Sequence, residues 1–595
     1  MHIHVPMNDH RQMERTTGIG RELSRKRRDI LAMEPEAALD AIFDAPRPGP
    51  LVRSFTEQDF FLLIQEIGQS DALELLSLAS FRQWEHILDI EAWDRDRLDV
   101  QPLTRWLSLL MIANPARLVE WFLTDETELI EFYMFRNMDV FVRQHDQDPS
   151  DFGDGLFTLD DTFYIDFRED VGFDDEEARS LRDAFLTRFL EKLAEYDYPT
   201  YHRVMLEYGT FIPAEYEEEA YRRRNVRLGE KGFLPFDEAV SIYQPLKAKD
   251  LKAGGAKIIV KGDEGDGDLP APVFPAVNMG ADTPFTRALG ALRTEDVLEG
   301  LQAEFAGLSN QIVTADGITV RSREALRAVV EKACGYISIG LESLTTPADR
   351  RAVDAMAVLI KKYPLSRLFR VGYGKALALK WRAQRWRKEA WFEKKGLPLS
   401  FWDEAWMGVV GGLLLEKPLF FDNYQTGVIY REFASLADIR STRASLDAVI
   451  ALDDLLGRMD LPVVKNRFIT YKRLFLTLWA RNWLDLPQEM APIGLDRFRT
   501  FFNALWTPGG AERRIRDDMK ADFLGWAAEK SGKEKADIAD ELGTVLTDLF
   551  ASIASEYGAV AGSDLDPRWI HLFWVSRDPA ADDPKTQKEN ENALI

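Results

Sequence analysis

The feature that most constrains the fold is a recurrence of apolar positions near the N-terminus. The segment that begins at Leu62 aligns without gaps with the segment that begins at Leu107, 45 positions later. The matched apolar pairs are Ile67 with Ile112, Leu73 with Leu118, Leu78 with Leu123, Trp84 with Leu129, Ile87 with Phe132 and Leu88 with Tyr133. A partial third copy lies upstream, where Ile30, Leu31, Leu39, Ile42 and Phe43 match Leu75, Leu76, Trp84, Ile87 and Leu88. Such units are typical of HEAT and armadillo-like repeats. We therefore predict that residues 29–246 form a superhelical repeat domain.

Helix-start signals recur at the same spacing. Ser80 with Gln83 matches a capping box, and Asp125 with Glu128 places equivalent side chains one unit later. Pro35 suits the first turn of a helix in the upstream copy. We expect a helix to begin after each of these cues.

The stretch SFRQWEHILDIEAW, from Ser80 to Trp93, places a histidine among carboxylates and could be a catalytic or metal-binding helix. However, His86 aligns with Glu131 and Asp89 with Met134, so the polar residues are not repeated. Glu85 and His86 are adjacent, about 100° apart on a helix, whereas a di-iron site uses Glu-x-x-His spacing. We therefore expect a solvated helix face above a buried Trp84.

The remaining sequence predicts a second helical domain, and a mainly α protein overall. Residues 247–282 are rich in Gly, Asp, Pro and Ala and predict a linker. Helical stripes recur through 283–577, which we expect to be all-helical. Residues 1–28 are predicted to be a flexible basic N-terminus, and 578–595 a disordered tail. Alternation around Asp160 and Asp161 predicts a small β-hairpin near 154–167.

Metal and cofactor signals are weak. The carboxylates of residues 146–177 could collect Mg²⁺ or Ca²⁺, but they lack the ligand order of an EF-hand, so we favour a solvated acidic loop. Cys334 is the sole cysteine and is expected to be a buried small hydrophobe. We predict no metal site and no cofactor.

Two groups of basic residues are candidate sites for a partner or an anion. Arg222, Arg223, Arg224 and Arg227 follow the acidic run Glu217–Glu219. Acid-before-base spacing stabilises an exposed helix, although adjacent arginines could instead grip a phosphate or carboxylate.

The second group lies in the basic segment Ser366–Trp391. Its apolar residues form a helical stripe for the core: Ala376, Leu379, Ala383, Trp386 and Ala390. The basic residues left for other faces are Lys380, Arg382, Arg385, Arg387 and Lys388. They could pair with the chain's own carboxylates, bind an acidic protein partner, or bind nucleic acid or lipid.

The formal charge of -24, from 75 basic and 99 acidic residues, disfavours general binding to nucleic acid or anionic membrane. The polar N-terminus does not match a signal peptide, and the apolar run Met407–Leu415 is too short to span a bilayer. We expect a cytoplasmic protein that is not in a membrane.

Catalytic motifs are not matched. The VGYGKAL segment has Ala376 where a phosphate-binding loop needs Ser or Thr, and Tyr336 stands where a nucleophile elbow around Ser338 needs glycine. Carboxylate pairs leave no sequence signature, so an enzyme stays open and no catalytic residue is assigned.

Two resemblances bear on the fold. The segment DALELLSLASFRQWEHIL, within about residues 30–142, resembles the cytoplasmic superhelical N-domain of bacterial magnesium transporters. It implies a fold and not transport, because the transporters' membrane half has no counterpart here. Three segments are similar to an uncharacterised family of large soluble bacterial proteins: Glu218–Leu246, Ile337–Leu344 and Leu368–Leu377. That resemblance spans most of the chain and implies no assigned activity.

The leading hypothesis is a cytoplasmic helical scaffold that binds a protein partner; a homo-oligomer is compatible with it. The alternatives are an enzyme or small-ligand-binding protein with a site between the two domains, and nucleic-acid binding through residues 366–391.

Overall fold

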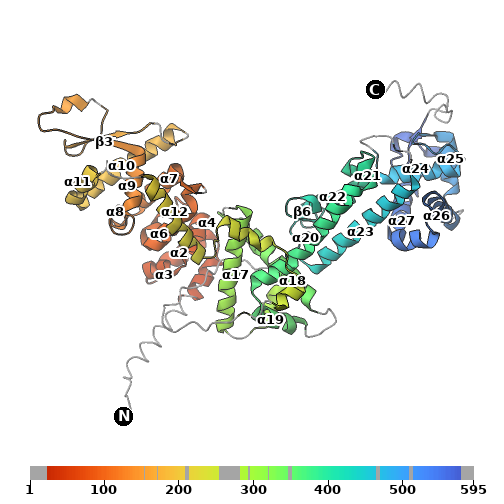
Figure 1. The fold of residues 1–595 in the computed structure, drawn as a ribbon, viewed down its shortest axis with the longest axis horizontal. Helices are drawn as coiled ribbons and strands as arrows, with labels where there is room; N and C mark the ends of the chain where they lie inside the picture. Colours follow the sequence, from red (N-terminus) through yellow and green to blue (C-terminus); the bar gives the residue numbers. More distant parts are fainter. Residues whose placement is uncertain are drawn as a thin grey trace, which may run out of the picture. The chain divides into compact units, whose positions relative to one another are not determined.

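The computed structural model is mainly helical, and its sheets are small and two-stranded (Figure 1). It describes residues 23, 25–94, 96–152, 155–169, 172–173, 175–207, 213–253, 257, 282–292, 295–318, 320–345, 352–461, 463, 469–507 and 513–577. The chain divides into two compact units, here called the N-terminal unit, Met1–Val371, and the C-terminal unit, Gly372–Ile595.

A set of three consecutive helices occurs twice near the start of the N-terminal unit. Helices α2 (Pro35–Phe43) and α3 (Pro48–Ser54) precede α4 (Glu57–Ile67), α5 (Leu73–Leu78) and α6 (Phe81–Glu91). After the short antiparallel pair β1 (Trp93–Asp94) and β2 (Arg97–Leu98) come α7 (Val100–Ala113), α8 (Pro115–Thr124) and α9 (Thr127–Asn137). The ends of α7, α8 and α9 each lie 46 residues after those of α4, α5 and α6. Three consecutive helices therefore recur where the apolar pattern recurs; the HEAT or armadillo type stays a prediction.

Most of the matched apolar residues lie in the core. Trp84, Ile87, Leu118 and Phe132 are fully buried, whereas Ile112 is 54% exposed. The capping box of Ser80 and Gln83 is confirmed, and α2 begins at Pro35 as expected. The cap predicted at Asp125 is wrong. Asp125 ends α8 in a helical conformation, and α9 begins after Glu126 without a side-chain cap, because an N-cap residue needs an extended backbone.

The sheet in the acidic region has a strand that the local pattern did not indicate. Strand β3 (Met138–Val142) pairs antiparallel with β4 (Phe163–Phe167), and the short 3-10 helix η1 (Pro149–Phe152) lies between them. Phe157 adds a single bridge to Ile165. The hairpin predicted near 154–167 therefore supplies one strand of this sheet, and the main partner lies upstream.

The rest of the N-terminal unit packs around these helices. Its elements are α10 (Glu176–Tyr196), α11 (Tyr198–Glu207), α12 (Pro213–Glu230), α13 (Phe236–Ala239), η3 (Val240–Tyr243), α14 (Ala248–Ala253), α16 (Pro284–Gly290), α17 (Glu295–Asp316), α18 (Arg323–Leu344) and α19 (Ala352–Lys362). Helix α10 packs on α7 and α8, with the rings of Phe122 and Phe189 5.5 Å apart. Most of the predicted linker 247–282 lies outside the described residues, as do most of 1–28 and all of 578–595.

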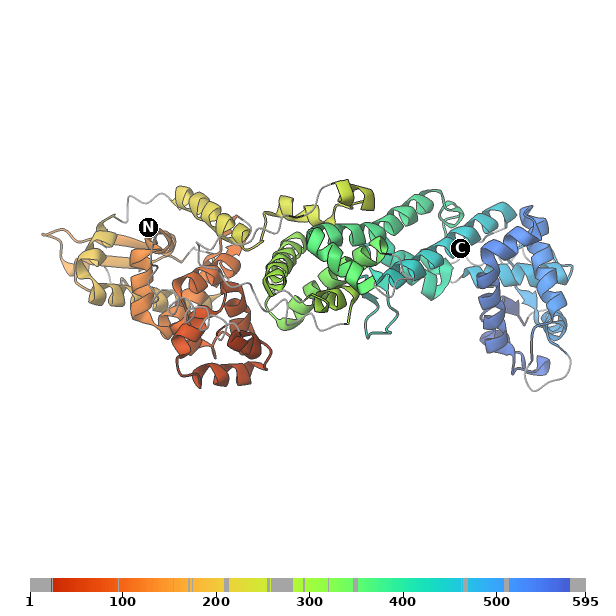
Figure 2. The same cartoon turned by 90° about the horizontal axis from the view of Figure 1, so that it is seen from below.

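The C-terminal unit is also helical. Its elements are α20 (Leu365–Glu389, which begins in the N-terminal unit), α21 (Trp391–Lys394), η4 (Leu399–Trp402), α22 (Asp403–Leu414), β5 (Phe420–Phe421), β6 (Tyr430–Arg431), α23 (Leu436–Met459), α24 (Tyr471–Trp483), β7 (Ile493–Gly494), α25 (Leu495–Ala504), α26 (Asp517–Ser531), α27 (Lys535–Tyr557), η5 (Gly562–Asp564), η6 (Pro567–Trp569) and β8 (Val575–Ser576). Helices α20 and α23 lie side by side in both views (Figure 1, Figure 2).

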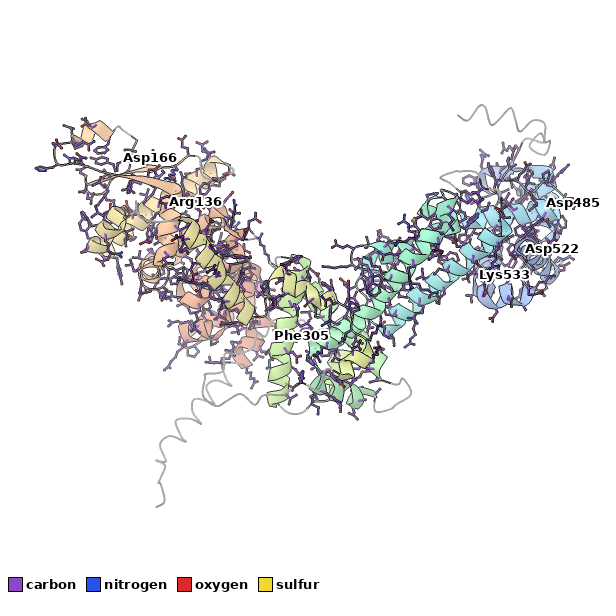
Figure 3. The ribbon with its side chains drawn as sticks, viewed as in Figure 1. Arg136, Asp166, Phe305, Asp485, Asp522 and Lys533 are labelled. Carbon is purple, nitrogen blue, oxygen red and sulfur yellow. The ribbon has the colours of Figure 1, made fainter. Side chains whose placement is uncertain are left out.

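The core of this unit is rich in aromatic rings. Trp402 and Trp479 are fully buried, and Trp479 packs edge-on against Phe523. The indole N–H of Trp479 donates to Asp522 of α26 at 2.8 Å, so its polar atom is satisfied. Asp522 is labelled in Figure 3. Across the described residues, no helix has the length and apolar character needed to cross a membrane.

Candidate functional site

The polar face of α6 is buried, which corrects the expectation of a solvated face. His86 is 1% exposed and Asp89 is 3% exposed, although Trp84 is the buried anchor that was expected. Helix α12 and the residue that follows it, Lys231, lie more than a hundred residues downstream and cover this face with basic side chains. Neighbouring sequence contains no sign of that cover, because it comes from a long-range contact.

Asp89 is the centre of the contact between α6 and α12. Its carboxylate accepts two hydrogen bonds from Arg227, at 2.9 Å from Nε and 2.7 Å from Nη2. Its backbone carbonyl accepts from Arg224 Nε at 2.6 Å, and the Arg224 guanidinium lies 5.2 Å above the ring centre of Trp93. A bidentate pair of this kind fixes both direction and register.

His86 is held as a neutral core residue. Burial, then the charges of Lys231 and Arg227, lowers its pKa well below 6.5. Its ring lies near Phe61 and Phe233, and Lys231 Nζ is 3.4 Å from Nδ1. The Lys231 carbonyl accepts from Asn310 on α17 at 2.6 Å, so this end of α12 is anchored to a second helix. His86 is therefore a neutral side chain enclosed between aromatic rings and Lys231.

A cavity of about 590 Å³ opens beside Asp89, between α6, α9 and α12. Its charged lining residues are the carboxylates Glu85, Asp89, Asp125, Glu126 and Glu128 and the guanidiniums Arg82, Arg223 and Arg227. Its aromatic lining residues are Phe81, Trp93, Trp121 and Tyr216. Five carboxylates face three guanidiniums, so the lining has an excess of negative charge.

Glu85 and Glu126 form a carboxyl pair in this cavity. Burial, followed by the charge of Glu85, raises the pKa of Glu126 to about 7, and the two side chains are hydrogen-bonded. Burial also raises the pKa of Glu85, although Arg227 opposes the rise from 3.1 Å. Near neutral pH Glu126 is therefore partly protonated, as expected where like charges share a partly buried site.

The four arginines of α12 divide between two roles. Arg222 pairs with Glu218 at 2.6 Å and Arg223 with Glu219 at 3.1 Å, the predicted i,i+4 spacing on an exposed face. Arg223 also lies 3.6 Å from Glu128 at the edge of the cavity. Arg224 and Arg227 instead face α6, so the four side chains do not form one anion-binding cluster.

The second predicted group lies on α20 in the C-terminal unit. The expected core stripe is confirmed, because Ala376, Leu379, Ala383 and Ala390 are buried and Trp386 packs against the core. Lys380 donates to the carbonyls of Leu415 and Glu416, at 2.6 Å and 2.5 Å. Arg382 pairs with Asp447, and Arg387 with Glu393. Arg385 is exposed.

Other candidate groups have structural roles. Cys334 is 4% exposed, as expected, and burial raises the pKa of its thiol to about 12. Ser338 is buried and accepts from the Phe285 backbone N–H at 3.2 Å. Asp160, in the acidic region, accepts from Tyr198 at 2.9 Å. Within the described ranges, no group of three or more His, Cys, Asp or Glu side chains is placed to hold a metal ion.

Sequence reasoning missed Glu126 and Tyr216, which come from different helices. A partial signal was present in the charge spacing, because Glu85 and Asp89 are four residues apart on α6. Residues four apart share one helix face, so one cation can pair with both, as Arg227 does.

Fold and cavity together define a mainly helical protein with a charged, aromatic-lined cavity in its N-terminal unit. A family model matches residues 18–576, and the chain therefore belongs to the family of unknown function DUF6178. Neither the curated proteins nor the solved structures include a match to it.

Proposed function

We propose that this protein is a helical scaffold that binds a protein partner by taking a lysine or arginine side chain of that partner into the cavity of its N-terminal unit. The observation that supports this proposal is the Glu85–Glu126 pair, which faces a cavity with more carboxylates than guanidiniums. A basic side chain that enters can replace the proton of Glu126 and interact with both carboxylates.

The walls of the cavity fit the same ligand. Tyr216 supplies aromatic surface beside the carboxylates, and a cation near an aromatic face gains roughly 0.5–2 kcal/mol. Arg227 is held by Asp89 and Glu85, so one end of the site is fixed before a partner arrives. A preformed site loses less entropy on binding.

The recurring helices of residues 35–137 support a scaffold of the HEAT or armadillo kind, since such arrays present an extended surface to protein partners. We further propose a cytoplasmic location, consistent with the acidic composition.

Calorimetric titration with a capped pentapeptide tests the proposal. A peptide with a central lysine should bind, and the same peptide with norleucine should not. The double variant Glu85→Gln, Glu126→Gln should weaken binding roughly tenfold, because it removes both carboxylates from the cavity. The matched control is Glu218→Gln, Glu219→Gln, which removes two carboxylates from the exposed face of α12. Equal binding of the lysine and norleucine peptides would refute the proposal.

A small cationic metabolite is the second candidate ligand, because the cavity volume lies within the range of small-ligand pockets, about 300–1,000 Å³. A thermal-shift screen with simple diamines separates the two ideas. A diamine that raises the melting temperature, with no binding of the lysine peptide, would favour the small ligand.

A further inference from the structure

A second hollow, of about 440 Å³, lies between α20 and α23 in the C-terminal unit. Its lining residues are Arg382, Arg385, Trp386, Lys388, Glu389 and Ile450. Three basic side chains and one carboxylate give the lining a local charge of +2, although the whole chain carries -24. The charge of this lining is therefore opposite in sign to the net charge of the protein.

Two carboxylates of α23 close to this hollow, Asp447 and Asp453, are already engaged. Asp447 pairs with Arg382. Asp453 accepts the indole N–H of Trp386 at 3.0 Å and the backbone N–H groups of Trp391 and Phe392 at 2.9 Å and 3.1 Å. Asp453 therefore organises the turn after α20 and is not available to neutralise the basic residues.

Arg385 and Lys388 differ from the other basic residues at this end of α20. Both are exposed, and within the described part of the chain neither has an ion pair or side-chain hydrogen bond. Trp381 precedes them by four and seven residues and is 47% exposed. Positions spaced in this way share one helix face, so an aromatic ring and two unengaged cations form one stripe.

We propose that this stripe and hollow, here called the α20 groove, bind an acidic segment of a protein partner through its carboxylates. Asp447 pairs with Arg382, so Arg385 and Lys388 are the lining cations left for a ligand, and they match one or two carboxylates. Trp386 and Ile450 give the hollow an apolar wall, which suits a peptide that mixes acidic and apolar side chains. An exposed tryptophan beside such a hollow is the residue type that most often anchors a protein interface.

Nucleic acid fits the same observations less well. Affinity for nucleic acid grows with the number of phosphates neutralised, and two free cations in a chain of charge -24 neutralise few. Glu389 also lines the hollow and would repel a run of phosphates. A short segment with one or two carboxylates needs fewer cations and carries fewer negative charges for Glu389 to repel.

Fluorescence anisotropy with the full chain tests the α20 groove. The probes are a labelled peptide of alternating glutamate and leucine, the same peptide with glutamine in place of glutamate, and a labelled oligothymidylate. We expect the glutamate peptide to bind best, and its affinity to fall as salt is added. The variant Arg385→Gln, Lys388→Gln should weaken that binding roughly tenfold.

The matched control is Arg440→Gln, Arg443→Gln on α23, which removes two exposed cations that do not line the hollow. Circular dichroism and melting temperature check that both variants fold. If the control variant lost as much affinity for the glutamate peptide, the loss would reflect the overall charge of the protein and would overturn the proposal. It would also be overturned if the oligothymidylate bound more tightly than the glutamate peptide, or if no probe bound. The lysine-peptide titration uses the other unit, so the two tests can fail separately.

Discussion

Replacing Glu126 with glutamine should stabilise the N-terminal unit at alkaline pH and leave its stability unchanged at acid pH. Glutamine keeps a hydrogen-bond donor toward Glu85 but cannot ionise. In the wild type, burial and the charge of Glu85 raise the pKa of Glu126 from 4.5 to about 7. Because its folded-state pKa is raised, Glu126 contributes stability that is fully present below pH 4.5 and is lost as the pH rises through 7.

The size of the effect follows from that pKa difference. At about 1.4 kcal/mol per pKa unit, the difference between 4.5 and about 7 gives at most about 3.5 kcal/mol. Glu126 is partly exposed, and solvent screening reduces the figure to about 1–2 kcal/mol. With an unfolding entropy of about 2.1 cal/mol/K per residue, and 371 residues in the unit, the expected rise in melting temperature is roughly 1–3 °C.

Scanning calorimetry at about pH 5 and about pH 8 measures the difference between wild type and variant. The transition of the N-terminal unit is identified as the one that Asp89→Ala lowers. Glu218→Gln, on the exposed face of α12, serves as the control and should leave the melting temperature unchanged at both pH values. A Glu126→Gln variant that was less stable than wild type at alkaline pH would refute the reasoning, because Glu126 would then contribute as an ionised partner.

Three further predictions concern the same unit. Asp89→Ala should destabilise it by about 3–5 kcal/mol, because the partly buried Arg227 loses its bidentate carboxylate partner. Glu219→Ala, on the exposed face of α12, should cost under about 1 kcal/mol, and calorimetry compares the two variants. Gly232→Ala should lower the melting temperature, because the φ of Gly232 is +86° and a Cβ there would lie 2.6 Å from Gly307 Cα. Its control, Gly229→Ala, lies in open space within α12 and should increase the free energy of unfolding by about 0.5–1 kcal/mol. Binding of the lysine peptide should strengthen from about pH 6 to about pH 8, because Glu126 must release its proton, and the Glu126→Gln variant should lose this dependence in calorimetric titration.

The helices of the N-terminal unit could be predicted where each is defined by its own residues. The apolar stripe, the Ser80 capping box and Pro35 each indicate an element through contacts within a few residues, and the structure has those elements. The cap at Asp125 failed because the end of α8 holds that residue in a helical conformation. Strand β4 was visible as local alternation, but its partner β3 follows α9 directly and has no turn signal to connect the two. Pairing that depends on distant segments leaves no local pattern.

The same reasoning explains why the cavity was missed while two of its arginines were named. A polar helix face is favourable in water and also favourable against a face of opposite charge, and one helix alone does not distinguish these cases. His86, Asp89 and Glu91 lie on a helix face that was predicted to be solvated, because polar and charged side chains are mostly exposed in folded proteins. Three buried polar side chains on one short helix need partners. Arg227 of α12 pairs with Asp89, and Lys231, just after α12, contacts His86. Glu91 forms an ion pair, at 3.0 Å, with Arg321, which lies just before α18. One helix of the recurring set is thus held by charges from two separate later segments, which fixes the geometry of the cavity beside it.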